Sequence, residues 1–415
     1  MLRLVAWIAR LLPEKGPIRV LTLSSLIASV GSGLYISGSA VYFVSYVKLS
    51  PTQVGIGLSI GGLGGLLLGP ALGRAADRIG ARSATMIFTA AQVVLLVGAG
   101  LVHSFGPFLV IIVLLGVAES GEAVSRGALV AVVVGREQRV RLSAHMRSVW
   151  NLGFTLGVLL AGLALALNTK PAYLSLIWGH ALVMLVVLAL YLRVPADVRS
   201  ADGRRPRAAR QSPLRDLPYL MVAQVSGITR LGETVFTVAM PLWIVKHTDV
   251  PRALAAWIIG LNTIMIVLFQ VRAARGAEDV PGAVRIQRLS FLALAFACLF
   301  AAFTGMLPTV AAIAVLVLVV VMITLGEMWG EAARWCFRYE LAPPHAQGQY
   351  GGVFRLGQFV PAAVGPLLVT SLTDGLGLTG WLIIAGVFIA GLLVNRPVVA
   401  WAVRTRPSEE LAAAA

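Results

Sequence analysis

Acidic and basic side chains lie in the middle of long apolar segments of this chain, where a charge is costly to bury. Glu119, Glu122 and Arg126 occupy one such segment, at spacings that place all three on one face of a helix. A charged side chain at the centre of a bilayer costs about 2.5–3.5 kcal/mol on insertion scales. We therefore expect these side chains to face a cavity, water or one another, where they can bind a proton or a substrate.

The same pattern occurs again in the second half of the sequence. Glu327, Glu331 and Arg334 share one helical face in a later apolar segment, and Arg230 and Glu233 lie one turn apart in a third. Several positions in the two halves match at an offset of roughly 200–208 residues, which indicates a duplicated unit. Duplication is a common plan among transporters, with the substrate site at the interface of the repeats.

Two interpretations of these charges stay open. The glutamates closest to an arginine could form ion pairs that only hold the helices together, since pairing is a usual fate of charges inside a membrane. Glu119 and Glu327 lie further from an arginine on their own helix, so they are the preferred candidates for proton or substrate binding. A carboxyl group in a dry cavity favours its neutral form, which lets it carry a proton at neutral pH.

The composition indicates which solvent surrounds these segments. Of 415 residues, 58% are hydrophobic and only 13% are charged, against about 25% charged in soluble domains. The mean hydropathy is +0.87, which predicts an integral membrane protein. The net charge of +16 comes from Lys and Arg in short gaps between apolar segments. That placement is typical of membrane topology rather than of nucleic-acid binding.

Apolar segments long enough to cross a bilayer as helices, about 20 residues each, predict an all-α membrane protein with twelve transmembrane helices. Shorter alternating segments, which would indicate a membrane barrel, are not seen. The expected helices are 18–46, 52–74, 84–103, 107–132, 144–168, 172–194, 217–246, 252–271, 287–306, 309–335, 350–372 and 377–400.

Basic residues predict the orientation and the domain boundaries. The arginine-rich gaps are expected to be cytoplasmic, and with them both termini. The polar, proline-interrupted gap at 195–216 predicts a basic linker between two pseudo-symmetric six-helix bundles, 1–194 and 217–415. Arginine outnumbers lysine, and alanine, glycine and valine are abundant, which favours a bacterial cytoplasmic (inner) membrane as the location.

The loop after the second helix carries the most specific motif. Gly73, Asp77, Arg78, Gly80 and Arg82 are spaced as in a loop of the major facilitator superfamily, which this chain resembles over nearly its whole length. The resemblance implies two six-helix bundles that rock around a central cavity, and a monomer. It also implies that Asp77 acts in a cytoplasmic gate at the start of helix eleven. A carboxylate at a helix N-terminus is favoured by the helix dipole.

In this superfamily helices one, four, seven and ten line the cavity, and the acids described above fall on three of them. Helix one adds a polar and aromatic stripe, and tryptophans are expected nearby. Aromatic faces attract cations, so the predicted cavity is acidic and aromatic. Besides Arg126, Arg230 and Arg334, the residues expected to line it are Ser32, Tyr35, Ser39, Tyr42, Trp243 and Trp329.

Three further residues are assigned to the cytoplasmic gate. Arg147 and Asn151 begin helix five and Arg355 begins helix eleven, so salt bridges to Glu122 or Glu331 are expected there. His180 lies in an outer helix, where a structural hydrogen bond is expected. Drug antiporters of the superfamily often carry a Gly-Pro pair in helix five, which is absent here, so the antiporter resemblance is a general one.

No phosphate-binding loop, nucleophile–base pair or metal-ligand spacing occurs in the sequence, so neither an enzyme nor a cofactor is expected. The prediction is a secondary transporter that exports a lipophilic, cationic drug or natural product in exchange for protons, with membrane lipid around it. Proton-coupled uptake of a small polar nutrient and a lipid flippase on the same scaffold are the alternatives. A sensor would carry a soluble signalling domain, and no segment predicts one.

Overall fold

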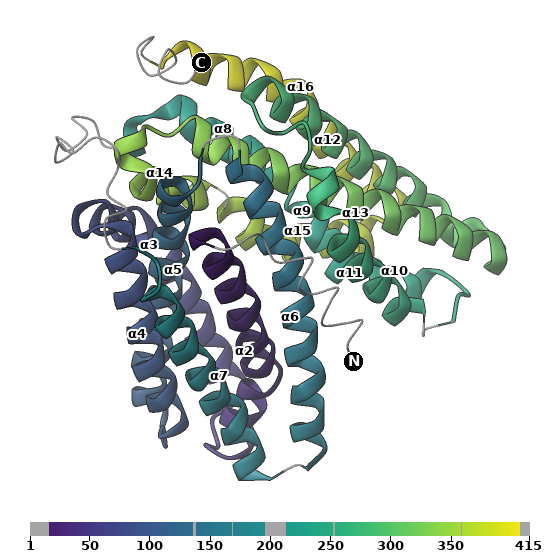
Figure 1. Cartoon of the computed structure of the whole chain (residues 1–415). Helices are drawn as coiled ribbons and strands as arrows, with labels where there is room; N and C mark the ends of the chain where they lie inside the picture. The colour runs from purple at the N-terminus through teal and green to yellow at the C-terminus, as the bar shows by residue number, and fades with distance from the viewer. Residues whose placement is uncertain are drawn as a thin grey trace. The chain divides into compact units, whose positions relative to one another are not determined.

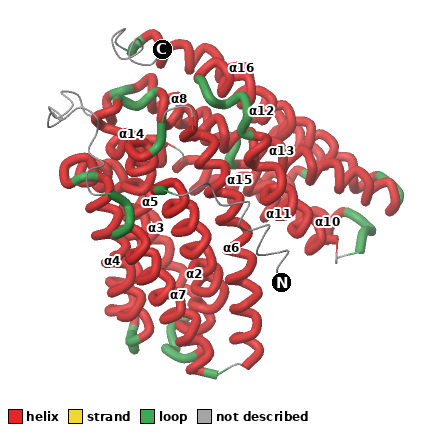
Figure 2. Tube along the Cα trace, in the orientation of Figure 1, coloured by secondary structure: helices red, strands yellow, loops and turns green. Residues whose placement is uncertain are grey.

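The computed structural model of the chain describes residues 16–135, 138–167, 169–195, 213–251, 254–357 and 359–406. All regular secondary structure in these ranges is helical, and no strand occurs within them (Figure 2). Nine helices of the described part are long and apolar enough to cross a membrane. The all-α membrane fold that the apolar segments predict is therefore confirmed.

The chain divides into two compact units. The N-terminal unit comprises Met1–Arg210 and Pro344–Leu356, and the C-terminal unit comprises Gln211–Pro343 and Gly357–Ala415. The predicted boundaries assign 344–356 to the second bundle, whereas this segment packs within the first unit. Most of the predicted linker, residues 196–212, lies outside the described ranges.

In the described part of the N-terminal unit, six long helices pack together with a short segment from late in the chain (Figure 1). The helices are α2 (Pro17–Ser45), α3 (Pro51–Ile79), α4 (Ala81–Gly100), α5 (Phe105–Val133), α6 (Arg139–Leu167) and α7 (Lys170–Tyr191), and the late segment is η5 (Pro344–Ala346) with α14 (Gln347–Gly357). α2 packs against α6 and α7, α3 against α5, and α4 against α5 and α7. Small residues allow this packing: a Cβ at Gly116 would lie only 2.4 Å from the Gly61 oxygen.

Local signals set where α3 begins and ends. Ser50 and Gln53 form a capping box, in which the Gln53 amide donates to Ser50 Oγ and the Ser50 amide donates to Gln53 Oε1. Gly80 ends the helix with a φ of 93°, a conformation that other residues rarely adopt. Asp77 is thereby placed in the last turn of α3.

The C-terminal unit consists of η2 (Pro213–Arg215), α8 (Leu217–Ile228), α9 (Leu231–Thr234), η3 (Val235–Ala239), α10 (Met240–His247), α11 (Leu254–Ala273), α12 (Val280–Phe303), η4 (Thr304–Met306), α13 (Thr309–Glu340), α15 (Phe359–Leu376) and α16 (Leu378–Arg404). In this unit α12 packs against α13 and α16, α11 against α13, and α8 and α15 against α16. Its core includes Phe291, Trp381 and Phe388, all fully buried.

One predicted helix, 217–246, is interrupted. A turn at Thr229 and Arg230 separates α8 from α9, and η3 is a π-helical stretch that runs into α10. Pro241 explains part of the irregularity, because proline has no N–H to donate to the preceding turn. π-Helical turns are frequent at functional sites. Here the break carries Arg230 and Glu233.

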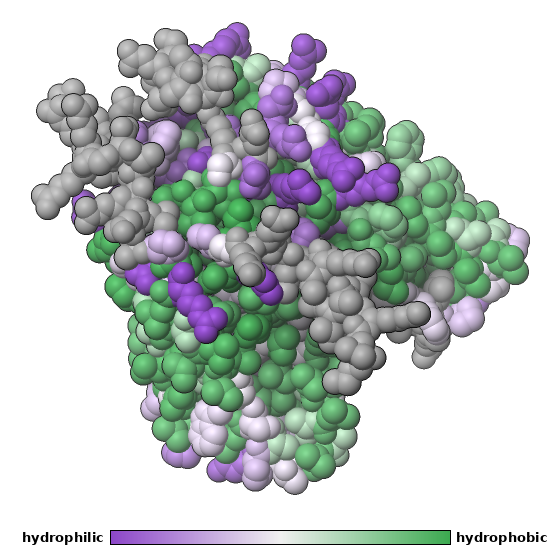
Figure 3. Space-filling model, viewed as in Figure 1, coloured by the Kyte–Doolittle hydropathy of each residue, from purple (hydrophilic) through white to green (hydrophobic). Residues whose placement is uncertain are grey.

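Large apolar side chains cover the sides of the long helices. Figure 3 shows hydrophobic residues over most of the visible side of the N-terminal unit. Val94 on α4 and Leu163 on α6 are each 70% exposed. Monomeric soluble proteins rarely expose contiguous apolar surface of this extent, so these faces are suited to lipid.

Candidate functional site

A cavity of about 620 Å³ lies within the N-terminal unit. Its size falls in the range of roughly 300–1,000 Å³ that is usual for small-molecule sites. Residues of α2 to α7 and of α14 form its wall, including α2 and α5, the predicted helices one and four. The polar and charged members of the wall are Ser24, Ser25, Ser32, Tyr35, Gln92, Glu119, Ser120, Glu122, Arg126, His180, Tyr191 and Arg355.

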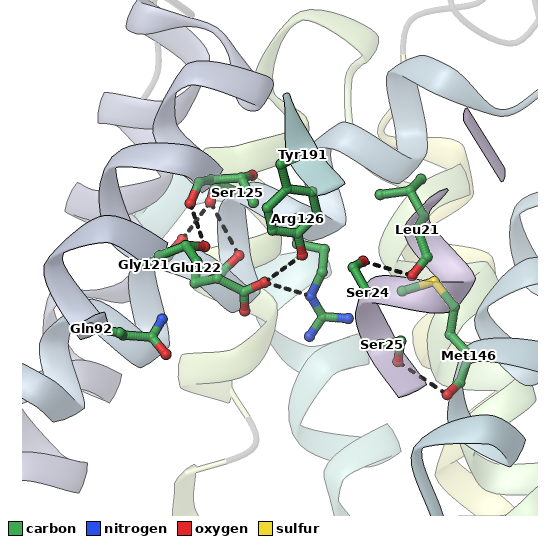
Figure 4. A network of polar contacts seen from close by, with 12 residues as sticks. Leu21, Ser24, Ser25, Gln92, Gly121, Glu122, Ser125, Arg126, Met146 and Tyr191 are labelled. Carbon is green, nitrogen blue, oxygen red and sulfur yellow. Dashed lines mark hydrogen bonds and ion pairs between the residues drawn. The ribbon is translucent and has the colours of Figure 1, made fainter. Parts of the chain in front are cut away.

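Glu122 is held in place by two neighbours. Arg126 Nε donates to Glu122 Oε1 over 2.9 Å, and the Tyr191 hydroxyl donates to the same oxygen over 3.0 Å. Figure 4 shows both side chains converging on this carboxylate from α5 and α7. A charge that is paired in this way is held in position by its partners. The geometry therefore favours the ion-pair interpretation for Glu122 and Arg126.

Glu119 lies one turn before Glu122 on α5 and differs from it in its contacts. Protein atoms surround the Glu119 side chain, but its open side faces the cavity, so a small molecule can reach it from there. Within the described part of the chain no ion pair or hydrogen bond holds its carboxyl group. Arg355 is a more distant charge neighbour, and its Nη1 donates to Ser120 O over 3.4 Å. Glu119 is thus the acid of this cavity that is open to a proton or a ligand.

Only the first half of the predicted stripe on helix one reaches the cavity. Ser32 and Tyr35 line it, whereas Ser39 and Tyr42 are buried elsewhere. Tyr42 is packed beside Phe43, and its hydroxyl donates to Gly100 O at the end of α4 over 3.0 Å. Ser39 and Tyr42 lie one and two turns further along α2, where neighbouring helices close against it. Neither residue therefore belongs to the wall of this cavity.

The predicted charges of the C-terminal unit form a chain of alternating sign. Arg230 Nη2 donates to Glu233 Oε2 over 2.9 Å, and Arg230 Nη1 lies 3.5 Å from Glu331 Oε1. Glu331 also pairs with Arg334, whose Nη1 donates to Thr229 Oγ1. Glu331 and Arg334 are buried, with side-chain exposures of 10% and 5%. This arrangement matches the interpretation in which the charges hold the helices together.

Glu327 has a neutral neighbour that the sequence analysis missed. Asn262 on α11 donates from Nδ2 to Thr324 Oγ1 over 3.0 Å and reaches Glu327 Oε2 at 3.4 Å. Asn262 is 8% exposed. An amide in the middle of an apolar segment was a signal in the sequence, because such a group needs a polar partner inside a membrane.

The two predicted tryptophans differ in position. Trp243 is buried in the core of the C-terminal unit, where its Nε1 donates to Thr304 Oγ1 over 2.9 Å. Its ring stacks on His247, with the ring centroids 4.1 Å apart, and meets Trp381 edge-on, with the centroids 5.6 Å apart. Trp243 therefore contributes to the packing of the C-terminal unit. Trp329 is half-buried on α13.

The structure places Asp77 at the N-terminus of α14. Its Oδ1 accepts the Gly348 amide and its Oδ2 accepts the Gln349 amide, each over 2.8 Å. Glycines permit the approach, because a Cβ at Gly73 would lie 2.2 Å from Gly348 O. A carboxylate at free N–H groups is stabilised by hydrogen bonding and by the helix dipole together.

Two other residues assigned to the gate donate to backbone carbonyl groups. Arg82 Nη2 donates to Leu192 O over 3.1 Å, and Asn151 Nδ2 donates to Arg147 O within α6 over 2.9 Å. Arg78 is exposed. Glu122 pairs with Arg126 on its own helix. His180 was expected to form a structural hydrogen bond, yet none is present within the described ranges, and its ring lies in the cavity wall.

The described residues contain no group of three or more histidine, cysteine or acidic residues that could hold a metal ion. Cys298 and Cys336 are both buried. The acidic, basic and hydroxyl side chains of the cavity offer proton exchange, ion pairing and hydrogen bonding, all of which suit reversible binding of a solute.

Comparisons with known proteins agree with the fold. Residues 21–366 match the model of a family described as Major Facilitator Superfamily. No significant match was found among curated proteins. Of the solved structures, the human organic anion transporter MFSD10 (TETRAN) is 18% identical, with 92% of this chain and 100% of that chain covered and a TM-score of 0.63.

Two other solved structures have higher TM-scores. The proton:xylose symporter XylE is 13% identical, with coverages of 92% of this chain and 95% of that one and a TM-score of 0.69. A bacterial homologue of the iron transporter ferroportin is 16% identical, with coverages of 94% and 100% and a TM-score of 0.72. At such identities the likeness shows the fold alone.

Proposed function

This chain belongs to the major facilitator superfamily, and we propose that it exports a lipophilic, cationic drug or natural product in exchange for protons by alternating access. Members of this family are multi-pass membrane transporters rather than enzymes, and they bind small-molecule substrates as single chains. The substrate class, the direction of transport and the coupling to protons are the proposed part.

The observation that carries the proposal is the state of Glu119. It is the carboxyl group in the cavity that no ion pair or hydrogen bond of the described chain engages, whereas Glu122 beside it is held by Arg126 and Tyr191. A single open carboxylate can bind either a proton or a cation, but not both. Mutually exclusive binding of this kind is what an exchange mechanism requires.

The remaining acids receive separate roles in this proposal. Glu327, next to Asn262, is the second candidate for proton binding. Glu233 and Glu331 belong to the chain of ion pairs in the C-terminal unit and position the helices that carry them. Asp77, at the N-terminus of α14, acts in the gate.

Uptake of a polar nutrient is the second candidate, and the cavity wall is the observation that favours it. Ser24, Ser25, Ser32 and Ser120 line the cavity beside Glu119. Together these four hydroxyl groups could form hydrogen bonds with a polyhydroxylated solute. In that case Glu119 would bind a proton that travels with the solute instead of against it.

We further propose that the chain lies in a bacterial cytoplasmic membrane with both termini on the cytoplasmic side. The support is the placement of arginine in the gaps that include Arg74 to Arg82 and Arg272 to Arg288. Exposed apolar faces on α4 and α6 would contact lipid.

Transport by purified protein in liposomes tests the proposal. Tetraphenylphosphonium is a suitable probe because its charge does not change with pH, and potassium with valinomycin clamps the membrane potential. With an acidic interior, the antiport mechanism predicts accumulation of the cation inside, and collapse of the gradient with nigericin stops it. Glu119→Gln is expected to reduce this accumulation to the level of protein-free liposomes, since glutamine cannot exchange a proton.

Glu233→Gln is the matched control, because this glutamate is half-exposed and paired with Arg230. It is expected to retain most of the activity. Accumulation of xylose under an acidic exterior, without movement of the cation, would favour uptake instead. Normal gradient-driven transport by both Glu119→Gln and Glu327→Gln would refute the coupling mechanism.

A further inference from the structure

His180 occupies a gap that glycine leaves in α2. The residue lies on α7, and its Nδ1 faces Gly31, where a Cβ would lie only 2.2 Å from this nitrogen. Any side chain at position 31 would therefore displace the imidazole. The ring is 4% exposed and stacks on Tyr35, with ring centroids 5.6 Å apart and an angle of 24° between the planes.

The imidazole is buried without a hydrogen-bond partner. Nδ1 has none, and no other residue within the described ranges bonds to the ring. An unsatisfied buried polar group costs about 1–3 kcal/mol, and buried polar groups without partners are few in native proteins. An apolar side chain of similar size would avoid this cost if the position served packing alone.

The same ring lies in the wall of the cavity that contains Glu119. Tyr35 and His180 line it together, and Met184 follows one turn later on α7. The wall thus combines an open carboxyl group with an aromatic surface and a neutral polar group on a different helix. An imidazole can donate or accept a hydrogen bond, depending on its tautomer.

We propose that His180 contacts the substrate through a hydrogen bond, and that the substrate is an aromatic amine bearing a second hydrogen-bonding group such as a hydroxyl. This inference rests on the proposed function, in which Glu119 binds the cationic end. The ammonium group pairs with Glu119, the aromatic part lies against Tyr35, and the hydroxyl bonds to His180 Nε2, because Nδ1 faces Gly31. A purely lipophilic cation satisfies the first two contacts and leaves His180 without a partner.

Cysteine accessibility tests whether position 180 faces water. The two native cysteines are buried, so the unmodified chain measures the background. His180→Cys in liposomes is expected to react with a charged methanethiosulfonate reagent, because thiols react as thiolates. Leu182→Cys, 63% exposed on the same helix, and Ala181→Cys, 4% exposed, are the matched controls and are expected to stay unmodified. Labelling of His180→Cys no higher than the background overturns the proposal.

Binding then tests the contact itself, measured without any gradient by isothermal titration. Propranolol, an aromatic amine with a hydroxyl, is compared with tetraphenylphosphonium, which has no hydrogen-bonding group. His180→Phe keeps a ring on Tyr35 and removes the nitrogens. It is expected to weaken propranolol binding roughly five- to tenfold, the loss of about one hydrogen bond, and to leave tetraphenylphosphonium binding unchanged. His180→Gln is expected to restore part of the affinity.

The outcomes separate this inference from the proposed function. An equal loss for both probes in His180→Phe, with no rescue by His180→Gln, would show a structural role and overturn the contact. Wild-type protein that binds propranolol no more tightly than tetraphenylphosphonium overturns the substrate class. Binding that depends on His180, in protein that shows no proton-driven transport, supports the contact and refutes the coupling. His103→Gln, at an exposed position, controls for the loss of a histidine.

Discussion

Glu331→Leu is expected to lower the free energy of unfolding by roughly 3–5 kcal/mol, the range measured when one partner of a buried ion pair is removed. The substitution leaves Arg334, whose side chain is 5% exposed, without its carboxylate. A guanidinium group cannot lose its proton in a protein, so the charge stays buried. Denaturant titration in detergent micelles, followed by tryptophan fluorescence, measures the loss.

The reverse substitution is expected to be milder. Arg334→Leu leaves Glu331 with Arg230 Nη1 at 3.5 Å, and a carboxyl group can also take up a proton. The double variant Glu331→Leu/Arg334→Leu is expected to lose less than the sum of the two single losses, because neither charge remains. Glu233→Gln, at a half-exposed pair, is expected to lose less than about 1 kcal/mol. A loss of that small size in Glu331→Leu would show that the pair is not buried.

Gly73→Ala is expected to separate α14 from α3. The new methyl group would lie 2.2 Å from Gly348 O and 2.8 Å from Gln349 Cα, and backbone atoms cannot move aside as a flexible side chain can. Overpacking of this kind costs about 1–3 kcal/mol, and one or two kcal/mol change an equilibrium constant by a factor of roughly 5–30. Asp77 would lose both amide partners at the start of α14.

Hydrogen–deuterium exchange of the peptide that contains Gly348 and Gln349 measures this opening. Exchange in Gly73→Ala is expected to be at least about tenfold faster than in the unmodified chain, in line with the energy of overpacking. Gly64→Ala, on the same helix, is the matched control, since its Cβ would meet only side-chain methyl groups at 3.9 Å. Unchanged exchange in Gly73→Ala would show that α3 and α14 are not in contact in solution.

Hydropathy and residue spacing were sufficient to predict the helical membrane fold, and the resemblance carried by the motif from Gly73 to Arg82 indicated the family. A run of apolar residues long enough to cross a bilayer has few stable alternatives to a helix, because every backbone polar group must be satisfied within it. The side of the helix to which a charged residue in such a run turns can also be predicted. Glu119 and Glu122 had to turn away from lipid, and the structure places both in a cavity.

The spacing of residues could not predict which part of a helical face lines the cavity, because neighbouring helices decide what that face contacts. Ser39 and Tyr42 share a helical face with Tyr35, yet they are buried in the packing around α2. Trp243 was assigned to a cavity and packs against Trp381. A helical face is a property of spacing alone, whereas the groove into which it fits depends on the side chains of other helices.

The sequence by itself determined the class of protein, the helical form of its apolar segments and the residues that could not face lipid, because the bilayer imposes these choices locally on each segment. Only the tertiary structure decided which acid is paired and which is open. Glu122 and Glu119 have the same chemistry and nearly the same place on α5, and they are distinguished by Arg126 and Tyr191. It also brought His180 into the cavity wall, because the gap at Gly31 exists only when α2 and α7 are packed together.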